Sequence, residues 1–392
     1  MELNSLFLNR VGGKCIFMKC CERNSNIELL RIVSMLLILL NHLAVHGIGN
    51  LTGSSVSINV FYVKVLGLVG ELAVNIFVII SSWFMIEKTI NINKILKLVG
   101  EVFFYSFFIF IILIALNIIE LSELSFYKIL ICIFPVVFGH YWFITCYILL
   151  MLLSPYLNEI IEKMDKIKLK KLIQFMIITI VFIEGTIPKS FPNVFSSLIM
   201  FILLYFTTGY IKKYVYINRN SIIKNIYIFI GLFIIEISSV IVMCLVGNII
   251  NNVSLINYSS YFGKINSFFS FAISLEIFII TIKSKQFKNN IINFLSSSVL
   301  SVYLITDHIL FKELLWNRIF SINRLFNNPY FILITILICF VIYVVCIFID
   351  FIRKNTISKV FNYMCRKFFN IKYINNIKKY IIHSKLDFEK ML

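Results

Sequence analysis

The chain has 392 residues, of which 60% are hydrophobic and 14% are charged, and its mean hydropathy is +0.92. A soluble domain has roughly half apolar and a quarter charged residues, so this composition excludes a water-soluble enzyme and indicates a polytopic membrane protein. The net charge of +18 does not indicate a nucleic-acid partner, because the basic residues gather in the polar gaps between hydrophobic runs, as the positive-inside rule expects.

The chain begins with a polar, basic segment, residues 1–26, which we interpret as a cytoplasmic extension. Residues 27–352 are expected to form one membrane-embedded domain, an all-α bundle of about ten transmembrane helices. Residues 353–392 mix aromatic with basic side chains and are predicted to lie as an amphipathic tail on an anionic lipid surface. Apolar runs of the required length place the spans near 27–46, 66–86, 98–118, 141–158, 172–188, 196–212, 225–247, 265–282, 295–316 and 330–352.

The distribution of Lys and Arg predicts the orientation of these spans. With the N-terminus inside, the cytoplasmic segments hold 29 basic residues and the outer segments hold 7, which places both termini in the cytoplasm. A further apolar piece at 125–138 contains Pro135 and is expected to lie at the outer interface. If that piece crossed the membrane, everything after it would be inverted.

The first span carries two ionisable residues, Arg31 near its start and His42 eleven residues later. In an α-helix this step returns to within about 20° of the same face, roughly 16 Å further along the axis. Ionisable groups inside a bilayer mark functional sites by default, and Glu28 lies one turn before the arginine. The alternative interpretation is that Arg31 snorkels to the inner interface and that His42 is a packed core residue.

Other polar residues give weaker indications. His140, Trp142, Asp307 and His308 fall near the outer ends of their predicted helices, where they can line a site or simply cap helix ends. His42 and His46 share a helix face, but no third ligand is visible, so no metal site is predicted. The nine cysteines show no metal or disulfide spacing. Four acidic residues in or near the spans receive no role: Glu71, Glu184, Glu236 and Glu276.

Several of these segments together resemble acyltransferase family 3, whose first helix carries Arg or Lys, ten residues and then His. Glu28 to Arg31 followed by His42 is similar to that helix, and residues 70–84 are similar to the family's second helix. In the second helix Ser82 and Trp83 replace the usual Gly and Tyr. Lys94 and Lys97 stand where the family often has Arg-x-x-Arg, which keeps the charge but loses the bidentate fork. Residues 140–158 and 302–308 are similar to two later elements, so the resemblance covers about residues 26–350.

The resemblance implies an integral-membrane O-acyltransferase of the cell membrane. Its donor would be cytosolic acyl-CoA, most simply acetyl-CoA, and its acceptor a hydroxyl of a surface polysaccharide or lipid-linked sugar. Arg31, Lys94 and Lys97 would then bind the phosphate-rich donor, and His42 would act as general base or as transient acyl carrier.

The same resemblance leaves the acceptor-side residues less defined. His140, Trp142, Asp307 and His308 would line the acceptor side, with Trp142 able to stack on a sugar ring. A transporter or flippase of a lipid-linked sugar remains the main alternative, although we find no inverted repeat. A sensor or scaffold would need a sizeable soluble domain, and none is visible in the sequence.

Overall fold

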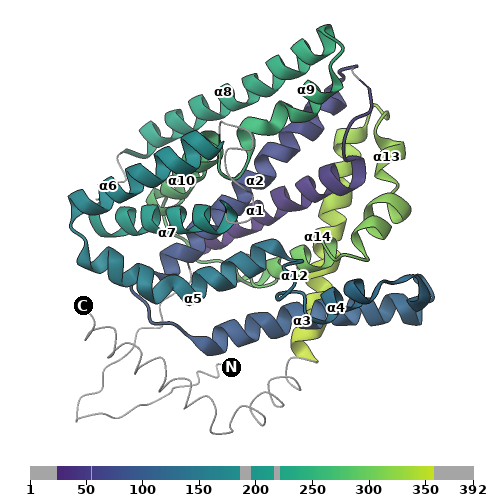
Figure 1. The fold of residues 1–392 in the computed structure, drawn as a ribbon, viewed down its shortest axis with the longest axis horizontal. Coiled ribbons are helices and arrows are strands. Elements are labelled where there is room, and N and C mark those ends of the chain that lie inside the picture. The colour runs from purple at the N-terminus through teal and green to yellow at the C-terminus, as the bar shows by residue number, and fades with distance from the viewer. Residues whose placement is uncertain (1–23, 54, 186–195, 216–220, 357–392) are drawn as a thin grey trace.

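The computed structural model describes residues 24–53, 55–185, 196–215 and 221–356, and these residues form helices and connecting loops without any strand (Figure 1). The prediction of an all-α fold is therefore confirmed. The predictions for the N-terminal extension and the basic tail fall almost entirely on residues 1–23 and 357–392, which lie outside the described residues.

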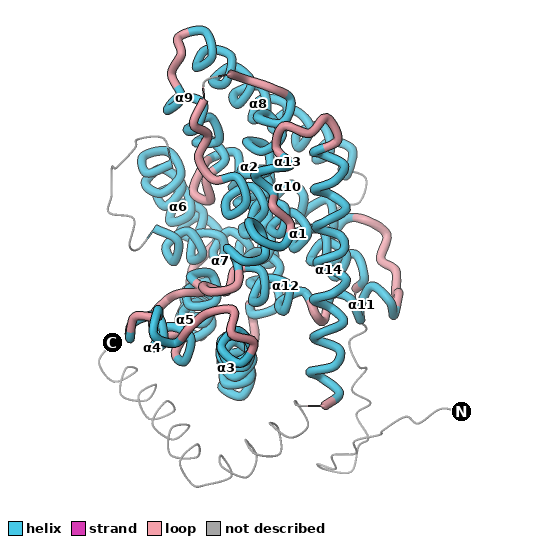
Figure 2. Tube along the Cα trace, turned by 90° about the vertical axis from the view of Figure 1, so that its right-hand side faces the viewer, coloured by secondary structure: helices cyan, strands magenta, loops and turns pink. Residues whose placement is uncertain are grey.

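Two helices form the centre of the bundle, α1 (Ser25–His42) and α2 (Ile58–Met85). Helix α1 begins where the Asn24 side chain accepts a hydrogen bond from the Asn26 amide, and it continues as the π-helical η1 (Leu43–Ile48). The apolar core of α2 is 72% buried, against 17% for the peripheral helix α8. Figures 1 and 2 both show α1 and α2 in the middle, with α8 and α9 above them and α3 and α4 below.

The remaining elements surround this pair. They are α3 (Ile92–Ala115), η2 (Leu121–Glu123), α4 (Phe126–Ile133), α5 (Trp142–Lys163), α6 (Lys166–Met176), π-helical η3 (Ile177–Glu184), α7 (Ser196–Tyr214), α8 (Ile222–Ile249), α9 (Val253–Asn257), η5 (Tyr258–Gly263), α10 (Phe268–Lys283), α11 (Asn290–Ser296), α12 (Val299–Thr306), π-helical η6 (Leu314–Ile319), α13 (Ile322–Leu325) and α14 (Phe331–Asn355).

Seven of the described helical segments are long and apolar enough to cross a membrane, so the chain is a multi-pass membrane protein. Helix α4 has eight residues and rises only about 12 Å, which is too short to cross. The predicted span 295–316 is wrong as a single helix, because α11 ends at Ser296 and α12 ends at Thr306. Serine hydroxyls compete for backbone partners at the first break, where Ser297 bonds the Phe294 carbonyl. The count of ten spans and the cytoplasmic termini stay predictions.

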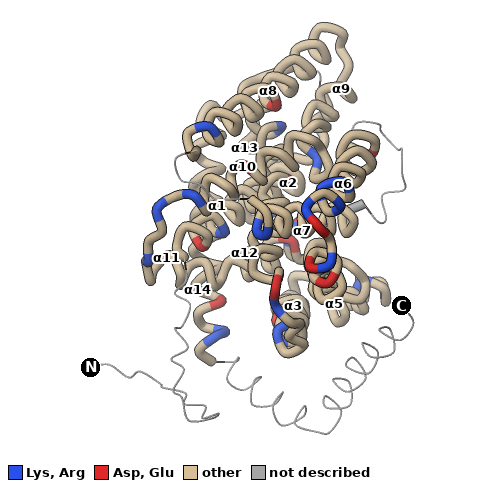
Figure 3. Tube along the Cα trace, turned by 90° about the vertical axis from the view of Figure 1, so that its left-hand side faces the viewer, with Lys and Arg blue, Asp and Glu red and all other residues tan. Residues whose placement is uncertain are grey.

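Contacts between chain-distant residues define the two ends of the bundle. At one end, which we call the basic end, Ser25 donates to the Phe287 carbonyl and Lys212 donates to the Trp83 carbonyl. Lys354 bonds Ser297 at the same end. Figure 3 shows further lysines and arginines at this end of the bundle. At the opposite end, which we call the far end, the loop after η1 and the start of α2 bond the connections next to α9 and α13. Helix α1 therefore runs from the basic end toward the far end.

Candidate active site

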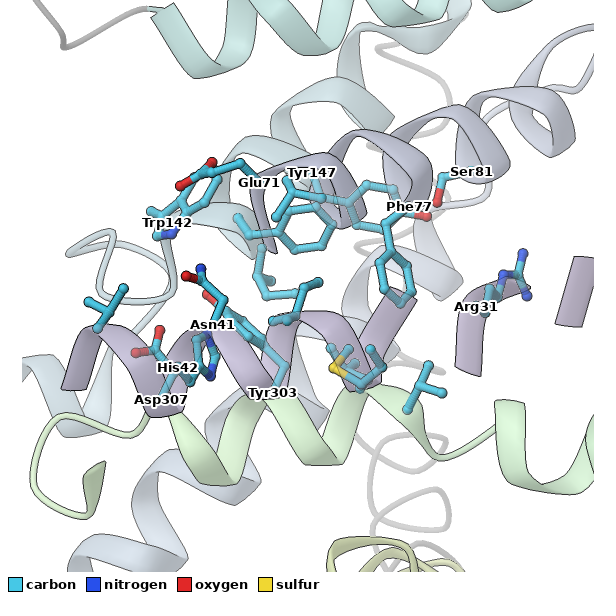
Figure 4. A pocket seen from close by; sticks show the side chains of 18 of the residues that line it. Arg31, Asn41, His42, Glu71, Phe77, Ser81, Trp142, Tyr147, Tyr303 and Asp307 are labelled. Carbon is cyan, nitrogen blue, oxygen red and sulfur yellow. The ribbon is translucent and has the colours of Figure 1, made fainter. Parts of the chain in front are cut away.

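A cavity of 540 Å³ lies along α1, with walls from α2, α5, α11 and α12. Figure 4 shows Arg31 at one end of the cavity, His42 with Asp307 at the other, and Phe77 between them. Apolar residues of α1 and α2 line the stretch between the two ends, among them Met35, Ile38 and Val74. The stripe predicted from the spacing of Arg31 and His42 is therefore one wall of a real cavity.

The Arg31 end is organised by a carboxylate. Nη1 of Arg31 lies 3.2 and 3.1 Å from the two carboxylate oxygens of Glu28, and the guanidinium carbon lies 5.4 Å from the ring centroid of Phe84. Glu28 also accepts a hydrogen bond from the Ser296 hydroxyl of α11. These contacts hold the guanidinium in place, and its Nε and Nη2 donors have no hydrogen-bond partner within the described part of the chain. The end of the cavity thus presents a fixed cation with donors still available.

The His42 end has a defined tautomer. The Thr306 hydroxyl donates its proton to the Val302 carbonyl at 2.8 Å, and Nδ1 of His42 lies 3.1 Å from the same hydroxyl oxygen. Because the hydroxyl proton is already used, the oxygen accepts from Nδ1, which must therefore carry the ring hydrogen. Nε2 is left as the unprotonated nitrogen. No hydrogen-bond partner for it occurs among the residues that the structure describes, so His42 presents a free lone pair.

Four more ionisable side chains gather beside His42. Nε2 of His46 lies 3.1 Å from the Asp307 carboxylate, and Nζ of Lys312 lies 3.6 Å from it. Nε2 of His140 donates to the Asp307 backbone carbonyl at 3.1 Å. The rings of His42 and His46 are 5.5 Å apart between centroids. Asp307 therefore fixes His46 through its carboxylate and His140 through its backbone, which orders the far-end wall of the cavity.

Of the residues singled out from the sequence, the structure brings five together around the cavity. Arg31, His42, His140, Trp142 and Asp307 all line it.

The other three lie elsewhere. His308 is fully buried in the turn after α12 and away from the cavity, where its ring lies 3.0 Å from the Ser106 carbonyl and accepts from the Leu310 amide. Lys94 and Lys97 are exposed at the start of α3, while their neighbour Leu98 lines the cavity.

Sequence reasoning gave no role to several cavity residues. Thr306 lies one position before Asp307 in the late element, but nothing in the sequence pairs it with His42. Glu71 was visible as a carboxylate inside a span, and that signal alone pointed to a functional site. Asn41 and Tyr147 also line the cavity, and their types carried no signal. No group of three metal-ligating side chains occurs in the described ranges.

A family model described as an acyltransferase domain matches residues 24–350, most of the chain. The chain belongs to acyltransferase family 3. The matched region begins at Asn24, the residue that caps α1, and ends at Asp350 in α14, so the whole cavity of this acyltransferase-family protein lies inside it. No curated protein and no solved structure matches the chain. The resemblance seen in the sequence is confirmed.

Proposed function

We propose that this family member is a membrane O-acyltransferase that moves an acetyl or longer acyl group from acyl-CoA to a hydroxyl of a cell-surface or lipid-linked glycan. The observation that carries the proposal is one continuous cavity with Arg31 at one end and the free Nε2 of His42 toward the other. A fixed cation and a basic nitrogen joined by an apolar passage suit a donor that has phosphates at one end and a thioester at the other.

The donor enters at the Arg31 end. Guanidinium groups bind phosphate oxygens through charge-assisted hydrogen bonds, and Arg31 keeps donors available for this purpose. The slender pantetheine arm of acyl-CoA then lies along the apolar stretch past Met35 and Phe77 and carries the thioester toward His42. Since acyl-CoA is cytosolic, this assignment puts the basic end in the cytoplasm. We assign the protein to the plasma membrane because its proposed acceptor is a cell-surface or lipid-linked glycan. Lys94 and Lys97, at the start of α3, add positive charge at the basic end of the bundle.

Two routes for the transfer are consistent with the position of Nε2. In the first, Nε2 takes the proton of the acceptor hydroxyl, the oxygen attacks the thioester carbonyl, the C–S bond breaks, and the proton passes to the leaving CoA sulfur. In the second, Nε2 itself attacks the carbonyl and releases the CoA thiolate, and the acyl group then passes from nitrogen to the sugar oxygen while the hydroxyl proton goes to the sulfur. Both routes release CoA and form one ester.

The acceptor approaches from the far end of the cavity. His140, Asp307 and Trp142 line that end, and an indole ring next to polar groups is a common surface for a sugar. Trp142 belongs to α5, His140 lies just before that helix, and Asp307 lies in the turn after α12. The acceptor side is therefore assembled only in the folded bundle.

The test is transfer of radiolabelled acetyl from acetyl-CoA to glycan in isolated membranes, with equal amounts of folded wild-type and His42→Ala protein. We expect label in the glycan for the wild type and a loss of about 100-fold or more for the variant. Retained transfer in His42→Ala contradicts the assignment of His42. Movement of a lipid-linked sugar across the membrane of vesicles that contain the protein, without any acetyl transfer, would favour the alternative function of a transporter or flippase.

A further inference from the structure

Glu71 lies in the cavity at the level of His42. An added Cβ on Gly70 would lie 2.3 Å from Cβ of Asn41, so residues 70 and 41 are the point where α2 and α1 touch. Glu71 follows Gly70 as His42 follows Asn41, and both line the cavity. Figure 4 shows Glu71 and Trp142 on the side of the cavity that holds His42, away from Arg31.

The Glu71 carboxylate has no hydrogen bond and no ion pair within 4.0 Å among the residues that the structure describes; Lys264 attracts it only from a greater distance. Three other carboxylates of the bundle are paired: Glu28 with Arg31, Glu101 with Arg353, and Asp307 with His46. A carboxylate without a partner is costly inside a membrane, and it is retained where it faces a wet cavity or a ligand.

The surroundings of Glu71 indicate what that ligand is. Trp142, Phe143 and Tyr147 present aromatic rings to the same part of the cavity. A carboxylate is an acceptor of hydrogen bonds only, so it recognises groups that donate, and aromatic faces bind the apolar face of a sugar ring. A cationic ligand is disfavoured because Arg31 and Lys312 line the same cavity. Neutral hydroxyl groups on a ring satisfy both features.

We propose that Glu71 binds a hydroxyl of the acceptor sugar, next to the ring face of Trp142, and so places a neighbouring hydroxyl at Nε2 of His42. This inference rests on the proposed function and adds to it a specific acceptor subsite. Glu71 forms no covalent bond and takes no part in donor binding. Its replacement therefore weakens the use of acceptor and leaves the use of acyl-CoA unchanged.

The experiment measures initial rates for purified full-length protein in lipid nanodiscs with radiolabelled acetyl-CoA. The acceptor probe is glycan extracted from cells that make only the His42→Ala variant, because its hydroxyls are unacylated. Each substrate is varied in turn for wild type, Glu71→Ala and Glu71→Gln. The matched control is Glu236→Gln, because Glu236 is also a buried carboxylate with an unpartnered oxygen in a spanning helix but does not line the cavity.

We expect the acceptor concentration for half-maximal rate to rise about tenfold or more in Glu71→Ala, as for the loss of a hydrogen bond to a charged group. The rise should be smaller in Glu71→Gln, whose amide oxygen still accepts, and absent in Glu236→Gln. Half-saturation by acetyl-CoA should stay within about twofold of wild type for all three variants.

Four results would count against this assignment. The subsite is overturned by an unchanged acceptor dependence in both Glu71 variants, by an equal rise for acetyl-CoA, or by the same rise in Glu236→Gln. Absence of any labelled glycan with wild-type protein overturns the proposed function itself. The failure of the subsite and the failure of the activity are thus separate outcomes.

Discussion

Two groups of charged side chains lie within the bundle, and they differ in whether every member is paired. In the first, which we call the Arg353 cluster, the guanidinium bonds the Glu101 carboxylate at 2.6 Å and the Asp350 carboxylate at 2.7 Å. Asp350 also bonds Lys354 at 2.7 Å and the Tyr105 hydroxyl at 2.8 Å. In the cavity, by contrast, Nε2 of His42 and the Glu71 carboxylate have no partner among the described residues.

This difference separates charge that holds the fold from charge that is available to a ligand. The Arg353 cluster ties α14 to α3, and Lys354 extends it to the serines between α11 and α12. Its charges compensate one another, so it offers nothing to a substrate. The cavity groups without a partner cost stability in the empty protein, as expected for groups that are available to a ligand. Four variants test this comparison.

The largest expected effect is on stability, in Arg353→Ala. Removing the guanidinium leaves Glu101 without its cation and Asp350 with Lys354 as its remaining cation. This change should lower the free energy of unfolding by about 3–5 kcal/mol. The measurement is equilibrium unfolding in detergent, combined with the acyl-transfer rate per folded molecule, which should stay near wild type. His42→Ala should show the opposite result, with little change in the free energy of unfolding and a large loss of acyl transfer. If both variants lost stability equally, the distinction between the two groups would fail.

Arg31→Ala should mainly affect the donor. Loss of a charge-assisted contact to phosphate predicts a rise in half-saturation by acetyl-CoA of about 10- to 100-fold, with the acceptor dependence unchanged. Arg31→Lys is the control, because it keeps the charge but not the planar fork. Its half-saturation by acetyl-CoA should lie between that of wild type and that of Arg31→Ala. If only the acceptor concentration for half-maximal rate rose, the assignment of Arg31 to donor binding would be wrong.

A smaller effect is expected for Thr306→Val, which removes the oxygen that accepts the Nδ1 hydrogen of His42 while preserving shape. Without that acceptor both tautomers become available, so the maximal rate should fall about 3- to 10-fold without a change in half-saturation by acetyl-CoA. Thr306→Ser should restore the rate. Thr208→Val is the matched control, since the Thr208 hydroxyl makes the same bond to the carbonyl four residues earlier but contacts no histidine. A rate loss shared by Thr208→Val would make the effect structural.

The smallest effect is expected for the double variant Lys94→Ala/Lys97→Ala. Both side chains are exposed, and solvent-screened charges contribute little, so half-saturation by acetyl-CoA should rise less than about threefold. The rise should disappear as salt increases. A change as large as that of Arg31→Ala would show that α3 moves toward the cavity when the donor binds.

Much of the architecture was readable from the sequence because lipid permits few solutions. Apolar runs predicted the spanning helices to within a few residues at most ends, and the eleven-residue step predicted the stripe of Arg31 and His42. The start of α2 was missed by eight residues, because Lys64 and Asn59 interrupt the apolar run although they are satisfied by bonds to Asn257 and Phe326.

The partners of the site residues could not be predicted, because they lie far apart in sequence. The pairs His42 with Thr306 and His46 with Asp307 are separated by 264 and 261 residues. Their contact depends on how α12 packs against α1, and hydropathy does not encode that packing. Lys94 and Lys97 illustrate another limit, since the sequence placed both before the span 98–118, whereas α3 begins at Ile92 and presents both to solvent.

The order in which the contacts of α1 can form bears on how the protein is made. Arg31 has its carboxylate only three residues away on the same helix, so the pair can enter the bilayer together as soon as this first helix is synthesised. The hydroxyl that sets the tautomer of His42 emerges 264 residues later, after the other walls of the cavity. A ribosome-bound chain therefore carries its arginine already neutralised by a neighbour but has no oriented imidazole. The proposed active site is therefore complete only once α12 has been inserted.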